Sequence, residues 1–354
     1  MIALRSAASL LLRSLSVLAL AGAFGVASVS AWAQASTPAG TAASGGAQAR
    51  EVRSWLLRIH EAASHRNFQG TFIVSGGGAV SSARIAHFRE GPNQFERSEA
   101  LDGQARHVYR HNDVVTTLWP TSKTAMVEQR NLLSQFPALL QAGDDRIADF
   151  YDVRPQGADR VAGREANVLL VKPRDGYRYG YRLWADQESG LLLRADVIGE
   201  RSEVLESSAF SDVTIGIKPH PESVLQPMKK LGGYRVLRPV LTQTRLDAEG
   251  WTMRQAAPGF RQVSCVKRPM DSTAAQGTAA RPQVLQTIFS DGLTYVSLFI
   301  EPFDPQRHTR PMLASVGPTQ TLMQQQGDWW VTVVGDVPPA TLHRFAKSLE
   351  RSSK

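Results

Sequence analysis

Hydrophobic and polar residues follow two different periods in the first half of the chain. Five apolar residues recur at helical spacing near residue 55: Val52, Trp55, Leu56, Ile59 and Ala63. This stripe predicts an amphipathic helix that lies on a sheet. From residue 68 the period changes to two, in short runs at 68–75, 82–89, 94–97, 105–110, 114–119 and 124–128. Turn residues separate these runs at even intervals, which predicts an antiparallel meander of strands.

The most aromatic alternation lies between residues 177 and 186. Aromatic or apolar residues occupy every second position, at Tyr177, Tyr179, Tyr181 and Leu183. The positions between them are Arg178, Gly180, Arg182 and Trp184. A turn containing Gly190 leads into a second apolar run at 191–199, so the segment predicts a hairpin. Because one face is aromatic and the other basic, we expect this hairpin to be the middle of a larger curved sheet.

Residues 131–152 interrupt the strands with two apolar patches at helical spacing. We expect these helices to cover the open face of the sheet, so that residues 50–215 form one α+β domain with a strongly curved, unclosed antiparallel sheet. Residues 34–49 are Ala-, Ser-, Thr- and Gly-rich and predict a disordered leader. Residues 216–231 contain several prolines and few contiguous hydrophobes, which predicts a stiff linker.

A second, smaller α+β domain is predicted for residues 232–354. Its clearest hairpin joins 284–289 to 293–300 across Asp291-Gly292, and another joins 319–325 to 329–334. Segments at 250–254 and 260–266 bracket a further turn. Pro338-Pro339 opens a final helix with one apolar face.

Residues 1–33 have the features of a cleaved secretory signal. Arg5 and Arg13 precede a diluted apolar run, which ends at Ala31-Trp32-Ala33. The net charge of +8 falls to about +6 without this segment, a modest excess. The single cysteine, Cys265, forms no internal disulfide. We therefore expect an exported, periplasmic protein.

No catalytic constellation is visible. The chain has no G-x-S-x-G elbow and no phosphate-binding glycine loop. His107 and His111 fall in a predicted strand, where i, i+4 spacing separates them too far for a shared metal. We expect no enzyme activity, no cofactor and no metal. Export also argues against a nucleic-acid partner, although the basic residues suit anionic lipid.

Six aromatic residues are candidates for a lipid-binding cavity in the curved sheet: Phe72, Trp119, Phe136, Tyr151, Tyr179 and Trp184. Aromatic residues at such positions are more often ordinary core, and the sequence leaves both alternatives open. The arginines spread over the same strands are read as a solvated sheet face.

Four separated motifs, in order, resemble the MucB/RseB family over essentially the whole mature chain. They are residues 160–164, 177–186 with 190–193, 289–293 with 296–302, and 332–340. The resemblance implies a larger N-terminal domain similar to the lipoprotein carrier LolA, an unclosed barrel capped by helices. It also implies a smaller partner-binding C-terminal domain.

The function implied by this resemblance is negative regulation of the sigma-E (AlgU-type) envelope stress response. Such a protein binds the periplasmic domain of an RseA/MucA-like anti-sigma factor and protects it from proteolysis, until lipopolysaccharide or another lipid releases it. It is peripheral to the inner membrane through this partner, and homo-oligomerisation is left open. The expected framework of the partner-binding domain comprises Leu293, Tyr295, Phe299, Trp329 and Trp330. A periplasmic lipid or lipoprotein carrier is the alternative; an exported hydrolase is disfavoured by the missing nucleophile motif.

Overall fold

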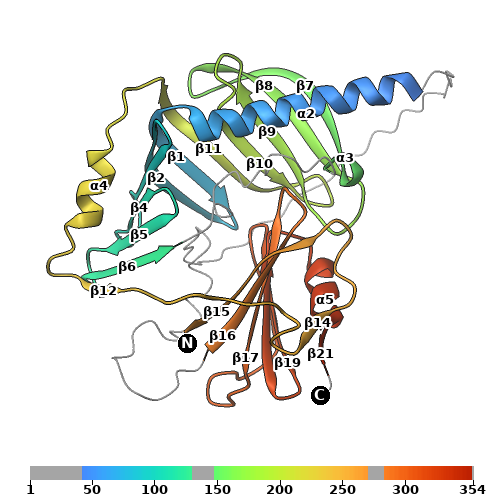
Figure 1. Cartoon of the computed structure of the whole chain (residues 1–354). Coiled ribbons are helices and arrows are strands. Elements are labelled where there is room, and N and C mark those ends of the chain that lie inside the picture. The colour runs from blue at the N-terminus through green and yellow to red at the C-terminus, as the bar shows by residue number, and fades with distance from the viewer. Residues whose placement is uncertain (1–41, 130–146, 270–282, 353–354) are drawn as a thin grey trace.

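Two mainly antiparallel sheets form the body of the molecule (Figure 1). The computed structural model describes residues 42–129, 147–269 and 283–352, with side chains from residue 54 onward. Within these residues the larger sheet has twelve strands and the smaller one has seven. The fold class predicted from the sequence is therefore confirmed.

The twelve-stranded sheet follows the order β12-β6-β5-β4-β3-β2-β1-β11-β10-β9-β8-β7. Its strands are β1 Phe68–Gly76, β2 Ala79–Glu90, β3 Asn93–Ala100, β4 His107–His111, β5 Val114–Trp119, β6 Thr124–Gln129, β7 Tyr151–Val161, β8 Arg164–Pro173, β9 Gly180–Asp186, β10 Leu192–Ile198, β11 Val204–Ile215 and β12 Arg235–Leu237. The sheet is unclosed, because its edge strands β12 and β7 lie at opposite ends of this order.

Irregular pairing bends this sheet. The register shifts between Thr71 and Phe72 of β1, where the strand pairs with β11. Gly70 precedes the shift, and a Cβ at this position would lie 2.2 Å from the carbonyl oxygen of Asp212. Further shifts occur between β9 and β10 and between β7 and β8. Because bulges increase local twist, they account for the predicted curvature.

Helix α2 (Ala42–His65) lies across the sheet (Figure 1). Its buried residues Leu56 and Ile59 pack in one cluster with Leu183, and Ala62 joins a second cluster with Phe210. The helix predicted near residue 55 is thus confirmed, but it begins at Ala42 and includes part of the segment predicted as a disordered leader.

The structure differs from the predicted linker at 216–231. Residues Glu222–Lys229 form helix α4, and Val224 is fully buried in a cluster with Phe88 and Tyr109. β12 then pairs in parallel with β6. The prolines of this segment favoured a linker in the prediction, but they do not prevent a helix here. Pro221 is the N-cap residue of α4, and Pro227 lies inside the helix. The segment is therefore an integral part of the larger sheet's outer layer.

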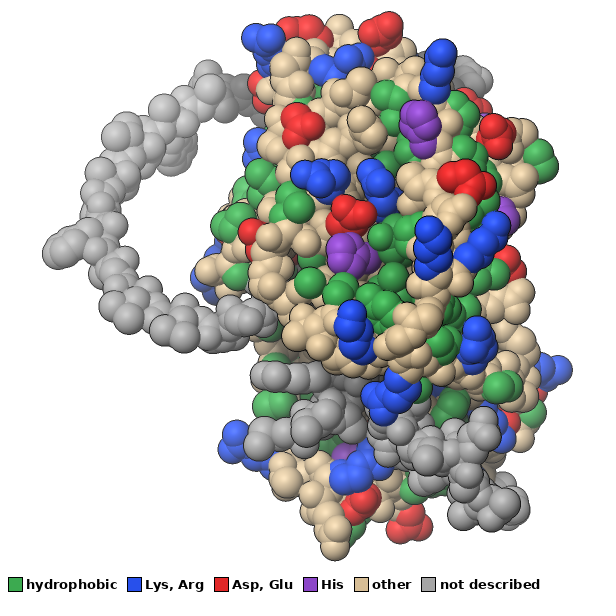
Figure 2. All heavy atoms as spheres, turned by 90° about the vertical axis from the view of Figure 1, so that its left-hand side faces the viewer, with side chains coloured by type: hydrophobic (Ala, Val, Ile, Leu, Met, Phe, Trp, Pro, Cys, Tyr) green, Lys and Arg blue, Asp and Glu red, His purple; other side chains and the backbone are tan. Residues whose placement is uncertain are grey.

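The face that carries α4 is mixed in character. Lys and Arg side chains surround an area of hydrophobic side chains near its centre (Figure 2). At the C-terminal end of α4, Lys229 closes the helix and Lys230 follows it. The mixture fits the modest positive charge of the chain.

The seven-stranded sheet follows the order β13-β15-β16-β17-β20-β19-β18. Its strands are β13 Thr242–Gln243, β15 Arg261–Pro269, β16 Gln283–Ser290, β17 Tyr295–Pro302, β18 Met312–Val316, β19 Thr319–Gln326 and β20 Trp329–Gly335. Helix α5 (Pro339–Ser348) buries Leu342 and Phe345 against Leu298 and Val333. Both predicted hairpins of this domain and its terminal helix are confirmed. The turn predicted between 250–254 and 260–266 does not join paired strands, because β14 (Trp251–Met253) pairs with β21 (Leu349–Arg351).

The predicted helices of residues 131–152 fall mostly outside the described residues, and so does Phe136. The described part is the single turn α3 (Ile147–Phe150). Tyr151, which was expected on a helix, begins strand β7.

Candidate functional site

The connection between β8 and β9 carries the aromatic segment into the second domain. The predicted strand was expected to start at Tyr177, but β9 starts at Gly180 and residues 174–179 form a loop. This loop contacts residues of the C-terminal half, which are distant in the sequence and therefore invisible to a pattern of alternation. We call the contact made by Tyr151, Tyr177, Arg178, Tyr179 and Asp291 the domain contact.

Arg178 lies at the centre of the domain contact. Its side chain is 0% exposed, and its guanidinium forms ion pairs of 3.1 Å with Asp175 and 3.2 Å with Asp291. It also donates a hydrogen bond to the carbonyl oxygen of Pro258. Three aromatic rings surround its charge at 4.6–5.4 Å: Phe150, Tyr151 and Phe260. The prediction of a solvated basic sheet face is therefore wrong for this arginine.

Asp291 supplies the carboxylate from the turn between β16 and β17. Its Oδ2 accepts a 2.8 Å hydrogen bond from the Tyr151 hydroxyl, and its Oδ1 accepts the backbone N–H groups of Leu293 and Thr294. Burial raises the pKa of Asp291, and this effect exceeds the opposing influence of Arg178. The sequence predicted Asp291 as a turn residue, which is correct, but gave no signal of its ion pair.

Further polar contacts extend the domain contact along helix α5 and strand β19. Thr341 donates a 2.7 Å hydrogen bond to the carbonyl oxygen of Tyr177, whose hydroxyl accepts one from Arg344 at 3.0 Å. The amide of Gln320 lies 3.4 Å from the hydroxyl of Tyr179, and burial raises the pKa of Tyr179 to about 12. The two domains are thus joined by buried, directional interactions.

The remaining cavity candidates have different surroundings. Tyr151 and Tyr179 are buried and belong to the domain contact. Trp184 follows Leu183 in strand β9, and neighbouring residues of a strand point to opposite faces of the sheet. Trp184 therefore lies on the face opposite to that of Leu183. Its indole N–H donates to Asp159 at 3.0 Å, and the guanidinium of Arg194 lies 4.4 Å from its ring. It is packed rather than open.

Phe72 and Trp119 are both half-buried on the larger sheet. Phe72 packs edge to face on Phe210 at 5.2 Å, whereas Trp119 ends strand β5. Their strands are separated by β2, β3 and β4. The structure therefore does not bring the described cavity candidates together in one site.

The five framework residues of the smaller domain also lie in different surroundings. Leu293 is buried in a cluster with Tyr151 and Leu183 of the larger sheet. Tyr295 and Phe299 lie on β17, and Trp330 is buried with its ring stacked 4.8 Å from His308. Trp329 is half-buried and lines a pocket.

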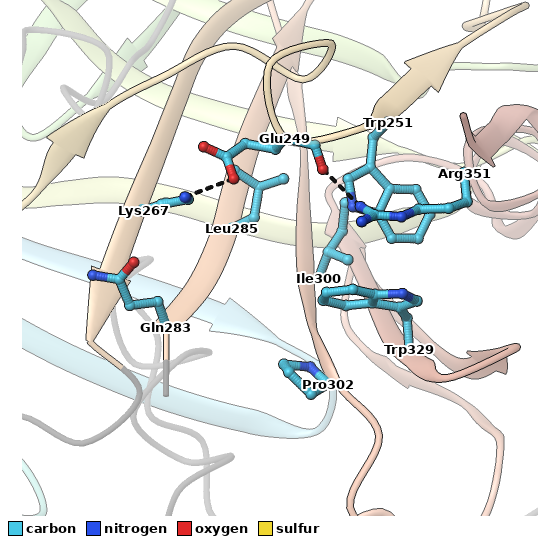
Figure 3. Close-up of a pocket in the computed structure, with 9 residues that line it drawn as sticks. All are labelled: Glu249, Trp251, Lys267, Gln283, Leu285, Ile300, Pro302, Trp329 and Arg351. Carbon is cyan, nitrogen blue, oxygen red and sulfur yellow. Dashed lines mark hydrogen bonds and ion pairs between the residues drawn. The ribbon is translucent and has the colours of Figure 1, made fainter. Parts of the chain in front are cut away.

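This pocket, the C-terminal pocket, has a volume of about 230 Å³. Its lining residues are Glu249, Trp251, Lys267, Gln283, Leu285, Ile300, Pro302, Trp329 and Arg351. The two indoles and Arg351 lie at one end, the ion pair of Glu249 and Lys267 at the other, and Leu285 and Ile300 between them (Figure 3). It lies at the end of the smaller domain's core. Arg351 carries no local sequence signal of this site, because Trp251 and Trp329 are distant from it along the chain.

No group of three or more His, Cys, Asp or Glu residues in the described ranges is arranged to hold a metal ion. No described helix combines the length and apolar character needed to cross a bilayer. Cys265 is buried, and burial raises the pKa of its thiol, so it is a poor nucleophile.

An open curved sheet, joined to a second sheet domain that carries an amphipathic pocket, is an architecture suited to a two-domain binding protein. The family comparisons agree with this division. The model of the MucB/RseB N-terminal domain matches residues 51–228, and that of the MucB/RseB C-terminal domain matches residues 245–350. The chain belongs to the MucB/RseB family.

Named relatives are regulatory proteins of sigma factors. The sigma factor AlgU regulatory protein MucB of Pseudomonas aeruginosa is 30% identical over 310 residues, which cover 85% of this chain and 92% of that protein. The sigma-E factor regulatory protein RseB of Escherichia coli is 25% identical over 296 residues, 83% of this chain and 89% of that protein.

Solved structures of MucB share the fold. The crystal structure of MucB in complex with MucA(peri) matches with a TM-score of 0.63 and 28% identity, covering 85% of this chain and 99% of that one. The complex structure of Pseudomonas aeruginosa MucA/MucB matches with a TM-score of 0.65 and 28% identity, covering 86% of this chain and all of that one.

Proposed function

We propose that this chain is a periplasmic regulatory protein that binds the periplasmic domain of an anti-sigma factor. Bound in this way, it protects that domain from regulated proteolysis and represses a sigma-E type envelope stress response. Lipopolysaccharide or another lipid releases it. The observation that carries the proposal is the family match across both domains, together with relatives solved as MucA/MucB complexes. The predicted export signal supports the same compartment for this protein as for such a partner.

The domain contact supplies a physical route for release. A lipid that favours another arrangement of the two domains weakens partner binding by the same factor by which the partner weakens lipid binding. Arg178 and Asp291 hold the present arrangement through a fully buried ion pair. A rearrangement of the domains must therefore open this ion pair. The free energy needed to open it sets how much more tightly the lipid must bind the rearranged state than the present one.

The test is a binding titration with purified components. Mature chain, starting after residue 33, is titrated with the periplasmic domain of an anti-sigma factor from the same organism, with and without lipopolysaccharide. We expect a complex that lipopolysaccharide dissociates and that slows cleavage of the partner by the initiating protease. A mature chain that ignores the partner but is purified with bound lipid would instead support the lipid or lipoprotein carrier.

A further inference from the structure

The C-terminal pocket contains a cation that is held in place but not neutralised. The guanidinium of Arg351 lies 5.2 Å from the ring of Trp251 and 4.9 Å from the ring of Trp329, and the two indoles pack edge to face at 5.6 Å. Its Nη1 donates a 2.6 Å hydrogen bond to the carbonyl oxygen of Glu249. Among the described residues, no carboxylate forms an ion pair with it.

The second cation of the pocket is already paired. The ammonium of Lys267 lies 2.6 Å from Glu249 Oε2, and Thr244 donates a 2.7 Å hydrogen bond to Oε1 of the same carboxylate. Although burial alone would raise the pKa of Glu249, these two partners and the nearby charge of Arg351 lower it, so the carboxylate is ionised at neutral pH. With Lys267 neutralised, the pocket has one net positive charge, located at the indole end.

The walls between the two ends are apolar. Leu285 and Ile300 are buried at their base, and Pro302 lies beside Trp329 (Figure 3). An apolar cavity next to a fixed cation is complementary to an apolar group that carries a nearby carboxylate. At about 230 Å³, the space is smaller than the roughly 300–1,000 Å³ that enclose a drug-sized ligand. Only one side chain of a larger molecule fits, and not a lipid with several acyl chains.

We propose that the C-terminal pocket binds one aromatic or branched aliphatic side chain of an extended polypeptide, with an Asp or Glu of the same segment paired to Arg351. The exposed amide of Gln283 at the mouth both donates and accepts hydrogen bonds, as pairing with a peptide group requires. The identification of this polypeptide with the anti-sigma factor rests on the proposed function, whereas the chemistry of the site does not.

The first test uses short peptides and is independent of any partner. The ¹⁵N-labelled mature chain is titrated with acetyl-Gly-Phe-Gly-Asp-Gly-amide, with its Asn counterpart, and with sodium octanoate, while the indole N–H resonances of Trp251 and Trp329 are followed. We expect both resonances to shift, and the Asp peptide to bind at least about 5-fold more tightly than the Asn peptide. Arg351→Gln should remove this preference. Equal affinity of the two peptides, or tighter binding of octanoate, would overturn the proposal.

The second test uses the periplasmic domain of an anti-sigma factor. Arg351→Gln and Trp329→Ala should each weaken its binding about 10-fold, as expected for anchor positions of an interface. Arg254→Gln is the matched control, because Arg254 is 70% exposed and paired with Glu350 on the neighbouring strand. If Trp329→Ala fails to fold, the exposed Arg351 decides the outcome.

The outcomes separate the two proposals. Wild-type chain that binds the domain, with unchanged affinity in Arg351→Gln, leaves the proposed function standing and refutes the pocket as its anchor. Wild-type chain that does not bind the domain refutes the proposed function, and the peptide titration alone then decides the pocket.

Discussion

Arg178 and Arg351 both lie against aromatic rings, but only Arg178 is removed from water. Arg178 is 0% exposed, is surrounded by three rings and forms ion pairs with Asp175 and Asp291. Arg351 is exposed, lies over two rings and has a backbone carbonyl as its hydrogen-bond partner. The same residue type with the same kind of neighbours therefore occurs in two electrostatic situations.

This difference in burial distinguishes the structural region from the region that is available for binding. A buried guanidinium must be paired, since leaving it uncompensated costs several kcal/mol. An exposed guanidinium is hydrated and tolerates the lack of a carboxylate. Arg178 accordingly fixes the domains, whereas Arg351 can exchange water for an incoming carboxylate.

The largest expected effect comes from Arg178→Gln. The substitution leaves the carboxylate of Asp291 buried without its cation, and we expect a loss of about 3–5 kcal/mol in the free energy of unfolding. Urea unfolding followed by circular dichroism measures this loss, and we also expect the two domains of the variant to unfold in separate transitions as they uncouple. Arg254→Gln should cost less than about 1 kcal/mol, because its ion pair is exposed. Equal losses in both variants would contradict a structural role for Arg178.

The pH dependence of this loss in unfolding free energy tests whether the carboxyl of Asp291 is the group responsible for it. Burial raises the pKa of this carboxyl, and Arg178 opposes the rise. Without Arg178, the folded-state pKa lies further above the unfolded value. Stability contributed by such a group is fully present below the unfolded pKa and is lost as pH rises through the folded pKa.

We therefore expect Arg178→Gln to be less destabilising at pH 4 than at pH 7. The difference should be about 1.4 kcal/mol for each unit by which the substitution raises the folded-state pKa of Asp291 above its wild-type value. Unfolding titrations at both values measure it. The double variant Arg178→Gln with Asp291→Asn should lack this dependence, and its persistence there would assign the effect to another group.

Much of the fold could be predicted because the relevant signals are local. The runs of period two became β1 to β6 within a few residues, and the Pro338-Pro339 pair marked the start of α5. Segment 216–231 failed because Val224, Leu225 and Met228 carry a helical pattern over only two turns, too short to outweigh the prolines.

The sites could not be predicted in the same way because their partners are distant in sequence. Arg178 meets Pro258 and Asp291 across 80 or more residues, and Arg351 meets Trp251 across 100. The alternation predicted that Tyr179 and Tyr181 lie on one face of a strand. Tyr181 does lie in β9, but Tyr179 precedes this strand and lies in the loop. Aromatic and basic composition indicated an unusual segment, but only the tertiary contacts show whether its charge is buried.

A smaller effect is expected from Gly259→Ala, which probes the close approach at the domain contact. Gly259 has φ +83°, and an added Cβ would lie 2.7–2.9 Å from ring atoms of Phe150. Backbone strain and this clash together should cost about 2–3 kcal/mol in unfolding free energy. Gly163→Ala is the matched control, because its φ is +76° but no atom lies within 4 Å of the added Cβ. It should cost only about 1 kcal/mol. Equal costs would show that Phe150 yields to the methyl group.

The smallest expected effect on stability is that of Arg351→Gln, the same substitution as at Arg178. It removes the cation–π contacts of an exposed arginine and leaves no carboxylate unpaired, so we expect a loss below about 1 kcal/mol in unfolding free energy. The same urea titration measures it, side by side with Arg178→Gln. A loss comparable to that of Arg178→Gln would mean that Arg351 supports the packing of β14 on β21, and the pocket would then have to be read as part of the core. A small loss would leave Arg351 as a residue whose place among the indoles contributes little to folding.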